Sequence, residues 1–205
     1  MTGDASRAPV VVMGVAAAGK STVGQALAAR LGVAFIDADD LHSDANRAKM
    51  SAGVPLDDDD RAPWLDAVGA VLAARGPADD EGDGPAASVV VACSALRRPY
   101  RDRLRAHAPA TVFVQLDAAP EVLRSRAEAR TGHFMPPELL DSQLATLEPL
   151  AADEPGCRVD VGAPVAEVVA DAIAALDALD GIAELGRDPH GESAGPDRDA
   201  LPVSG

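Results

Sequence analysis

Short apolar runs alternate along this chain with Ala- and Leu-rich segments of helical length. The apolar runs fall at residues 9–13, 33–37, 88–93, 111–117 and 157–161, and the helical segments at 22–31, 63–74, after Pro99, 120–130 and 164–176. Strand and helix in turn require crossover connections, which favour a parallel sheet with helices on both faces. The apolar runs carry no polar alternation, as is typical of strands covered on both faces. The pattern therefore predicts an α/β domain with five strands.

The same pattern sets the expected limits of the domain. We expect one domain over residues 9–179, preceded by a disordered N-terminus at 1–8. Residues 76–87 are rich in Gly, Pro and acids, which predicts a flexible surface excursion. Residues 180–205 lack periodicity and most large apolar side chains, so we expect a disordered C-terminal tail.

Charge and cysteine usage narrow the class of protein. The formal net charge of -15 argues against nucleic acid as the main partner, because phosphate backbones are bound by basic surfaces. Arginines nevertheless cluster at 97–105 and 124–130, which suits pockets for a small anionic ligand. Cys93 and Cys157 lie far apart and indicate neither a disulfide framework nor a zinc site. Without a leader or membrane-spanning pattern, we expect a cytoplasmic protein that does not bind membranes.

One motif carries specific chemistry. Gly14, Gly19, Lys20 and Ser21 fit the pattern GxxxxGK[ST] of a phosphate-binding loop, placed between a predicted strand and a predicted helix. In such a loop, backbone N–H groups and the helix N-terminus face the phosphates, the lysine reaches the β and γ phosphates, and the hydroxyl ligates Mg²⁺. We expect a bound Mg²⁺ nucleotide, contacted by Gly14, Ala17, Ala18, Gly19, Lys20, Ser21 and Thr22.

The middle of this loop is unusual. Ala16, Ala17 and Ala18 occupy positions where a further glycine is common. Because alanine pays a steric cost at positive φ, we predict negative φ for all three.

Two carboxylates follow the second predicted strand. Asp37 and Asp39 lie at its carboxyl end, where open α/β sheets bind ligands, and residues two apart on an extended strand share a face. One carboxylate can orient magnesium waters while the other receives a hydroxyl proton. No NKxD-type base reader with a DxxG switch appears in order, which favours a kinase over a GTPase.

Five segments in order carry a family resemblance: GVAAAGKST, FIDADDLH, NRAKMSAGVPLDDDDRAPWL, CSALRRPYRDRLR and RTGHFM. Together they resemble the gluconate kinase family, small P-loop kinases similar to shikimate kinases, over about residues 10–176. The resemblance implies a P-loop NTPase fold with sheet order 2-3-1-4-5, a lid at about 126–140 and a homodimer. It implies ATP as phosphoryl donor, Mg²⁺ as metal and the 6-hydroxyl of D-gluconate as acceptor.

The resemblance also implies roles for single residues. Asp39 contacts the acceptor hydroxyl, and Asp37 is associated with magnesium together with Ser21. Arg126 and Arg130 occupy lid-helix positions that stack on adenine or clamp phosphates. Lys20, Asp39 and Arg130 are the expected catalytic residues.

A polyhydroxy acid needs cations for its carboxylate and several polar groups for its hydroxyls. Arg97 and Arg98 follow the third predicted strand directly and are expected at the ligand crevice, where a guanidinium pairs bidentately with a carboxylate. Arg101, Arg103 and Arg105 are expected on a solvated helix face. The further substrate-contacting candidates are Asp39, His42, Lys49, Asp59, Arg61 and the lid residue His133, with Asn46 and Gln143 as additional options.

Two alternatives stay open on the residues alone. The chain could be a kinase for another small hydroxy acid or a nucleotide, or a module that binds ATP without transferring phosphate.

Overall fold

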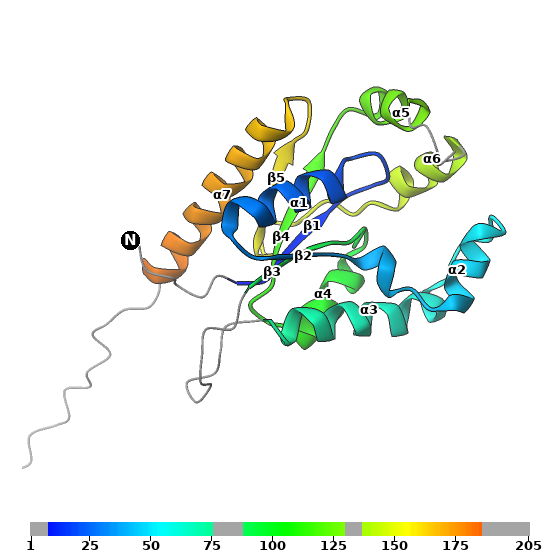
Figure 1. The fold of residues 1–205 in the computed structure, drawn as a ribbon, viewed down its shortest axis with the longest axis horizontal. Helices are drawn as coiled ribbons and strands as arrows, with labels where there is room; N and C mark the ends of the chain where they lie inside the picture. The colour runs from blue at the N-terminus through cyan, green and yellow to red at the C-terminus, as the bar shows by residue number, and fades with distance from the viewer. Residues whose placement is uncertain (1–7, 76–87, 130–136, 186–205) are drawn as a thin grey trace, which may run out of the picture.

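A five-stranded parallel sheet forms the centre of the protein (Figure 1). The structure is a computed structural model and describes residues 8–75, 88–129 and 137–185. The strands are β1 (Val10–Met13), β2 (Ala34–Asp37), β3 (Val89–Ala92), β4 (Val112–Asp117) and β5 (Gly156–Asp160). Their order is β2-β3-β1-β4-β5 and all neighbours are parallel, which confirms the predicted sheet.

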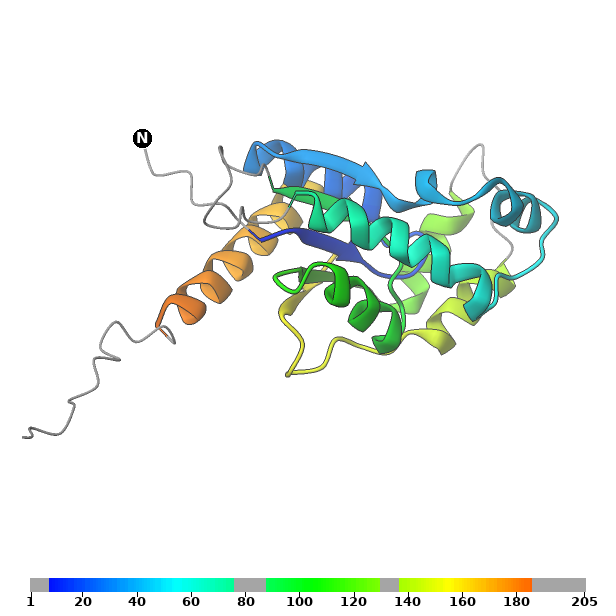
Figure 2. The same ribbon diagram turned by 90° about the horizontal axis from the view of Figure 1, so that it is seen from below.

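Helices cover both faces of this sheet. They are α1 (Lys20–Leu31), the 3-10 helix η1 (Ala38–Leu41), α2 (Asp44–Ser51), α3 (Asp58–Ala73), α4 (Arg98–His107), α5 (Pro120–Glu128), α6 (Pro137–Thr146) and α7 (Val165–Leu185). Figures 1 and 2 show α1 and α7 on one face and α3 and α4 on the other. No helix within the described ranges is long and apolar enough to cross a membrane.

The core divides into two layers because successive strand residues point to opposite faces. In β1, Val10 and Val12 pack with the α1 and α7 side, whereas Val11 and Met13 pack with the α3 and α4 side. All four β1 residues are buried, as the unbroken apolar run predicts. Helices thus pack on both faces of the sheet, and η1, α2 and α6 lie at its carboxyl edge (Figure 1).

Two helix boundaries differ from the sequence prediction. Helix α3 begins at Asp58, five positions before Pro63, because Asp57 caps it and Asp60 completes a capping box. The run of four aspartates is therefore a helix N-terminus, where the helix dipole favours negative charge. Helix α7 continues to Leu185, past the expected domain end at residue 179. The predicted excursion at 76–87, the central part of the predicted lid at 130–136 and most of the two termini lie outside the described residues.

Candidate active site

The segment between β1 and α1 has the backbone of a phosphate-binding loop. Gly14 has φ 147° and Gly19 has φ 92°, both in the region that favours glycine. A Cβ on Gly14 would lie 3.0 Å from the carbonyl oxygen of Leu116, so a larger residue would be strained by its φ and would press on this backbone. The Lys20 ammonium folds back over this loop and donates to the carbonyl of Val15 at 3.1 Å.

The prediction of negative φ throughout the alanine run is wrong at one position. Ala17 has φ 62°, in the left-handed region, whereas Ala16 and Ala18 do not. An L-residue pays about 1 to 2 kcal/mol for this conformation, which persists only where the surroundings enforce it. Tertiary contacts therefore override the local preference of alanine in this loop.

The N-terminus of α1 is built differently from those of α2 and α3. Ser43 caps α2 and Asp57 caps α3, but α1 has no side-chain cap and no acid in its first turn. The first N–H groups of a helix have no intrahelical partner and carry the positive end of the dipole. This end of α1 is therefore suited to bind an anion such as a nucleotide phosphate.

Asp37 joins this helix end to the next strand. Ser21 Oγ donates to Asp37 Oδ2 at 2.6 Å, and the backbone N–H of Asp39 donates to Asp37 Oδ1 at 3.1 Å. A hydroxyl and a carboxylate are hard oxygen donors of the kind that Mg²⁺ prefers, and protein sites for Mg²⁺ usually combine such groups with substrate phosphates. Within the described residues no cluster of three or more His, Cys, Asp or Glu could hold a metal by itself. The pair fits a metal held jointly with a nucleotide.

Asp39 lies on η1, directly after β2, and is exposed. Its backbone N–H donates to Asp37 Oδ1, and the same Asp37 carboxylate accepts from Ser21 Oγ at the start of α1. The start of η1 is therefore tied to the phosphate-loop helix. Burial raises the pKa of the nearby strand-end thiol of Cys93 to about 12.

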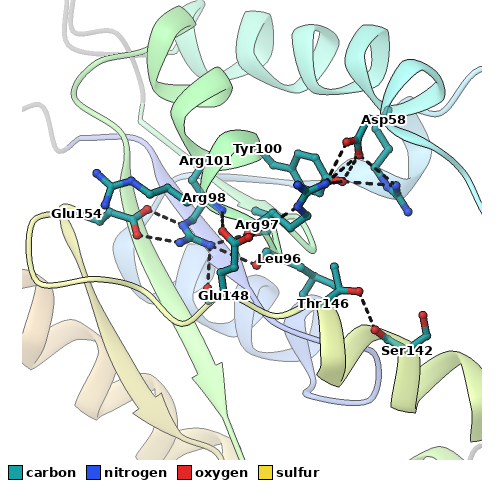
Figure 3. A network of polar contacts seen from close by, with 12 residues as sticks. Asp58, Leu96, Arg97, Arg98, Tyr100, Arg101, Ser142, Thr146, Glu148 and Glu154 are labelled. Carbon is teal, nitrogen blue, oxygen red and sulfur yellow. Dashed lines mark hydrogen bonds and ion pairs between the residues drawn. The ribbon is translucent and has the colours of Figure 1, made fainter.

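A compact ionic cluster lies where α4 meets the start of α3. The Tyr100 hydroxyl donates to Asp58 Oδ1 at 2.5 Å and Arg97 Nη1 donates to Asp58 Oδ2 at 3.0 Å (Figure 3). The guanidinium carbons of Arg61 and Arg97 lie 5.7 and 5.4 Å from the centroid of the Tyr100 ring. The hydrogen bond from Tyr100 and the Arg97 guanidinium hold the pKa of Asp58 below its ordinary value. Two cations thus share one aromatic ring and one carboxylate.

A small hollow of about 280 Å³ lies beside this cluster, between α2 and α3. Its wall is formed by Leu41, Ser43, Asn46, Asp59, Asp60, Pro63 and Trp64. Beneath it, His42 is buried and its ring stacks on Trp64 with centroids 4.4 Å apart. Burial lowers the pKa of His42, so the ring is neutral at pH 7. The hollow is small for a ligand pocket and presents hydroxyl, amide and carboxylate groups, which suits a small polar molecule.

Comparisons with known proteins agree on one family. Residues 10–150 match the family described as AAA domain. A probable gluconokinase of Mus musculus is 42% identical over 177 residues, which cover 82% of this chain and 96% of that protein. The gluconokinase of Gluconobacter oxydans (strain 621H) is 48% identical over 150 residues, 73% of this chain and 80% of that one. The chain belongs to the gluconokinase family.

A solved structure supports the same family assignment. The crystal structure of a gluconokinase from Sinorhizobium meliloti 1021 superposes with a TM-score of 0.78 at 46% identity, and the match covers 89% of this chain and 99% of that chain. The gluconokinase resemblance drawn from the five sequence segments is therefore confirmed.

One arginine of this gluconokinase-family chain corrects a prediction. Arg101 does not lie on a solvated face: it is 1% exposed and forms a bidentate pair with Glu154, at 2.5 and 2.8 Å. Its Nη1 also donates to the carbonyls of Ala95, Leu96 and Glu148 (Figure 3). Ala95 has φ 41°, so the buried guanidinium holds a strained turn at the end of β3. Arg97 starts from this turn and is positioned by it.

Some of the remaining predicted site residues lie at the Tyr100 cluster or the hollow, and others do not. Arg61 and Arg97 meet in the Tyr100 cluster, and Asp59 lines the hollow. Lys49 is paired with Asp60 at 2.6 Å, directly beside that hollow. Arg98 points elsewhere, because its guanidinium forms a bidentate pair with Asp153 at 3.0 and 2.7 Å.

The residues predicted to form a lid are only partly among the described residues. Arg126 Nη2 donates to the carbonyl of Val161 at 2.6 Å, on the segment that follows β5. Arg130 and His133 lie outside the described residues.

The phosphate-loop residue Thr22 is exposed in the first turn of α1.

The sequence analysis missed Tyr100, and within the run of four aspartates it chose Asp59 rather than Asp58. Tyr100 follows Arg97 by three positions on a helix, so the two share a face, and this spacing was a usable signal. Asp58 gives no such local signal, because its partners Arg97 and Tyr100 are about forty positions away.

Proposed function

We propose that the protein transfers the γ-phosphoryl group of ATP to the 6-hydroxyl of D-gluconate, giving 6-phospho-D-gluconate and ADP. The observation that carries this proposal is the connected path from Ser21 through the Asp37 carboxylate to the backbone N–H of Asp39, which ties the start of η1, where Asp39 lies, to the phosphate-loop helix. Membership of the gluconokinase family supports the choice of acceptor.

The donor side follows from the uncapped start of α1. The triphosphate lies against the loop from Gly14 to Thr22, whose N–H groups face its oxygens, and Lys20 contacts the phosphate that is transferred. Ser21 and Asp37 are the residues that would hold Mg²⁺, which neutralises phosphate charge when bound. Arg126 and Arg130 remain proposed contacts of adenine or phosphate.

On the acceptor side, Asp39 orients the hydroxyl and accepts its proton. The hydroxyl oxygen forms a bond to the γ-phosphorus while the bond from that phosphorus to the ADP oxygen breaks. A positioned base contributes a factor of about 10² to 10⁴, so most of the rate comes from alignment and charge neutralisation.

The far end of gluconate carries a carboxylate and needs a cation. The cluster of Arg61, Arg97 and Tyr100 provides two guanidinium groups balanced directly by Asp58, so an arriving carboxylate can replace Asp58 as partner of Arg97. A bidentate guanidinium–carboxylate contact is geometrically specific. The hollow lined by Asp59 and Asn46 is proposed for the hydroxyls, with Lys49, His42 and His133 as neighbouring contacts.

An acceptor panel tests this proposal. ADP release is measured with gluconate, shikimate and nucleoside monophosphates, and the product is identified by ³¹P NMR. We expect turnover with gluconate alone, phosphate on the C6 oxygen, and no turnover in Lys20→Ala. Equal turnover with shikimate or a nucleotide would contradict gluconate as the acceptor. ATP binding without turnover of any acceptor would support a non-catalytic ATP-binding module. Homodimer formation and a cytoplasmic location stay predictions.

A further inference from the structure

One contact of the phosphate loop comes from far along the chain. The backbone N–H of Ala16 donates to Gln143 Oε1 at 2.6 Å, across 127 positions of sequence. Gln143 is half-buried on α6, and Figure 1 shows α6 next to the loop between β1 and α1. A neutral amide thus holds the loop that faces the phosphates.

The contact falls directly before the strained residue. Ala17, with φ 62°, holds a conformation that an alanine keeps only where its surroundings enforce it. The other hydrogen bonds made by loop N–H groups before α1 are longer: Gly14 to the carbonyl of Ser94 at 3.3 Å and Ala18 to that of Val15 at 3.4 Å. Within the described residues, the Gln143 bond is therefore the shortest restraint on the N–H groups of this turn.

Gln143 is itself held in place. Several hydrogen bonds fasten the segment after α6 to the body of the domain. They include Glu148 N–H to the carbonyl of Leu96 at 2.8 Å, Arg101 to the carbonyl of Glu148 at 3.0 Å, Arg98 N–H to Glu148 Oε2 at 2.7 Å, and Leu150 N–H to Gln115 Oε1 at 2.7 Å. Figure 3 shows the end of α6 beside Leu96 and Glu148. A rigid support of this kind is what a restraint on a strained loop requires.

We propose that Gln143 is a positioning residue for the nucleotide: it holds Ala16 so that Ala17 keeps its left-handed conformation and the loop N–H groups stay aligned with the phosphates. This inference rests on ATP being the donor in the proposed function. It does not depend on the identity of the acceptor.

The test is a double-mutant cycle on the full chain, read as the Kd for Mg²⁺–ADP by isothermal titration calorimetry. Loss of one hydrogen bond corresponds to about a 3- to 10-fold weaker Kd, which we expect for Gln143→Ala. In the Ala17→Gly background the same change should have less than about a 2-fold effect, because glycine adopts positive φ without strain. Gln25→Ala, on the exposed side of α1, is the matched control and should bind as the wild type does.

A second variant separates positioning from general folding. Gln143→Glu keeps the acceptor oxygen and the side-chain size but adds a negative charge beside the phosphates. It should melt as the wild type does yet bind Mg²⁺–ADP more weakly than Gln143→Ala does. At saturating ATP, the KM for gluconate should be unchanged in both variants.

Two results would overturn the inference. One is wild-type affinity in Gln143→Ala, and the other is the same loss in both Ala17 backgrounds. Since ADP binding needs no acceptor, the cycle gives its answer even if gluconate is not the substrate. If gluconate is phosphorylated normally but the effects of the Gln143 and Ala17 substitutions on Kd simply add, only the positioning role of Gln143 is refuted.

Discussion

Replacing Arg101 with methionine removes one partner of a buried ion pair. The side chains of Arg101 and Glu154 are each 1% exposed, and among the described residues the substitution leaves the Glu154 carboxylate with one hydrogen bond, from the N–H of Ala151. Breaking a buried pair in this way costs about 3 to 5 kcal/mol, because an uncompensated charge stays in the interior. For a domain of this size that corresponds to a fall in Tm of about 6 to 20 °C.

The matched control lies two positions along the same helix. Arg103 also forms a bidentate pair, with Asp66 at 2.6 and 2.6 Å, but both side chains are 42% exposed. Exposed pairs are screened by water and salt, so Arg103→Met should shift Tm far less.

Thermal and urea unfolding followed by circular dichroism measure both variants. Arg101→Met should also raise the KM for gluconate in the fraction that stays folded, because the Ala95 turn that positions Arg97 loses its support. Equal Tm values for Arg101→Met and Arg103→Met would refute the reasoning that burial makes this pair important.

Further predictions concern the two ends of the site. Asp39→Asn should lower kcat by about 10² to 10⁴ at saturating substrates, measured as ADP release, since a base is lost; a wild-type kcat would remove its catalytic role. Asp37→Asn should raise the Mg²⁺ concentration needed for half-maximal rate. An unchanged dependence of the rate on Mg²⁺ would contradict a role of Asp37 in holding the metal. Arg97→Ala should raise the KM for gluconate far more than the KM for ATP, whereas the matched variant Arg98→Ala, which loses a pair with Asp153, should not. Burial lowers the pKa of His42 below 6.5, so the stability it contributes is complete above pH 6.5 and is lost as the pH falls below that value. His42→Phe should flatten this part of the curve of unfolding free energy against pH, and an unaltered curve would contradict it.

Local signals in the sequence predicted the backbone of the phosphate loop and the place of Asp37, because the loop glycines are fixed by spacing within one turn and Asp37 ends a strand. Asp39 was expected to share an extended strand with Asp37, but the chain turns into the 3-10 helix η1 at Ala38. The start of α3 was predicted wrongly at Pro63, although Asp57 and Asp60 have the three-residue spacing of a capping box that marks the true start.

Other features depend on partners that are distant in sequence. Glu154 lies 53 positions from Arg101, and Gln143 lies 127 positions from Ala16. The burial of Arg101 had one local signal, since Leu104 and Ala108 share its helix face and are both buried. The positive φ of Ala17 also had a local signal, because a further glycine is common at these positions of the phosphate loop, but the prediction gave the preference of alanine more weight.

The most direct measurement of the central claim is a crystal structure with a non-hydrolysable ATP analogue, Mg²⁺ and gluconate. The account predicts the 6-hydroxyl within hydrogen-bond reach of Asp39, about 2.6 to 3.2 Å, and facing the terminal phosphate beside Lys20. Gluconate bound away from this edge of the sheet, or an Asp39 carboxylate turned from the acceptor, would contradict it.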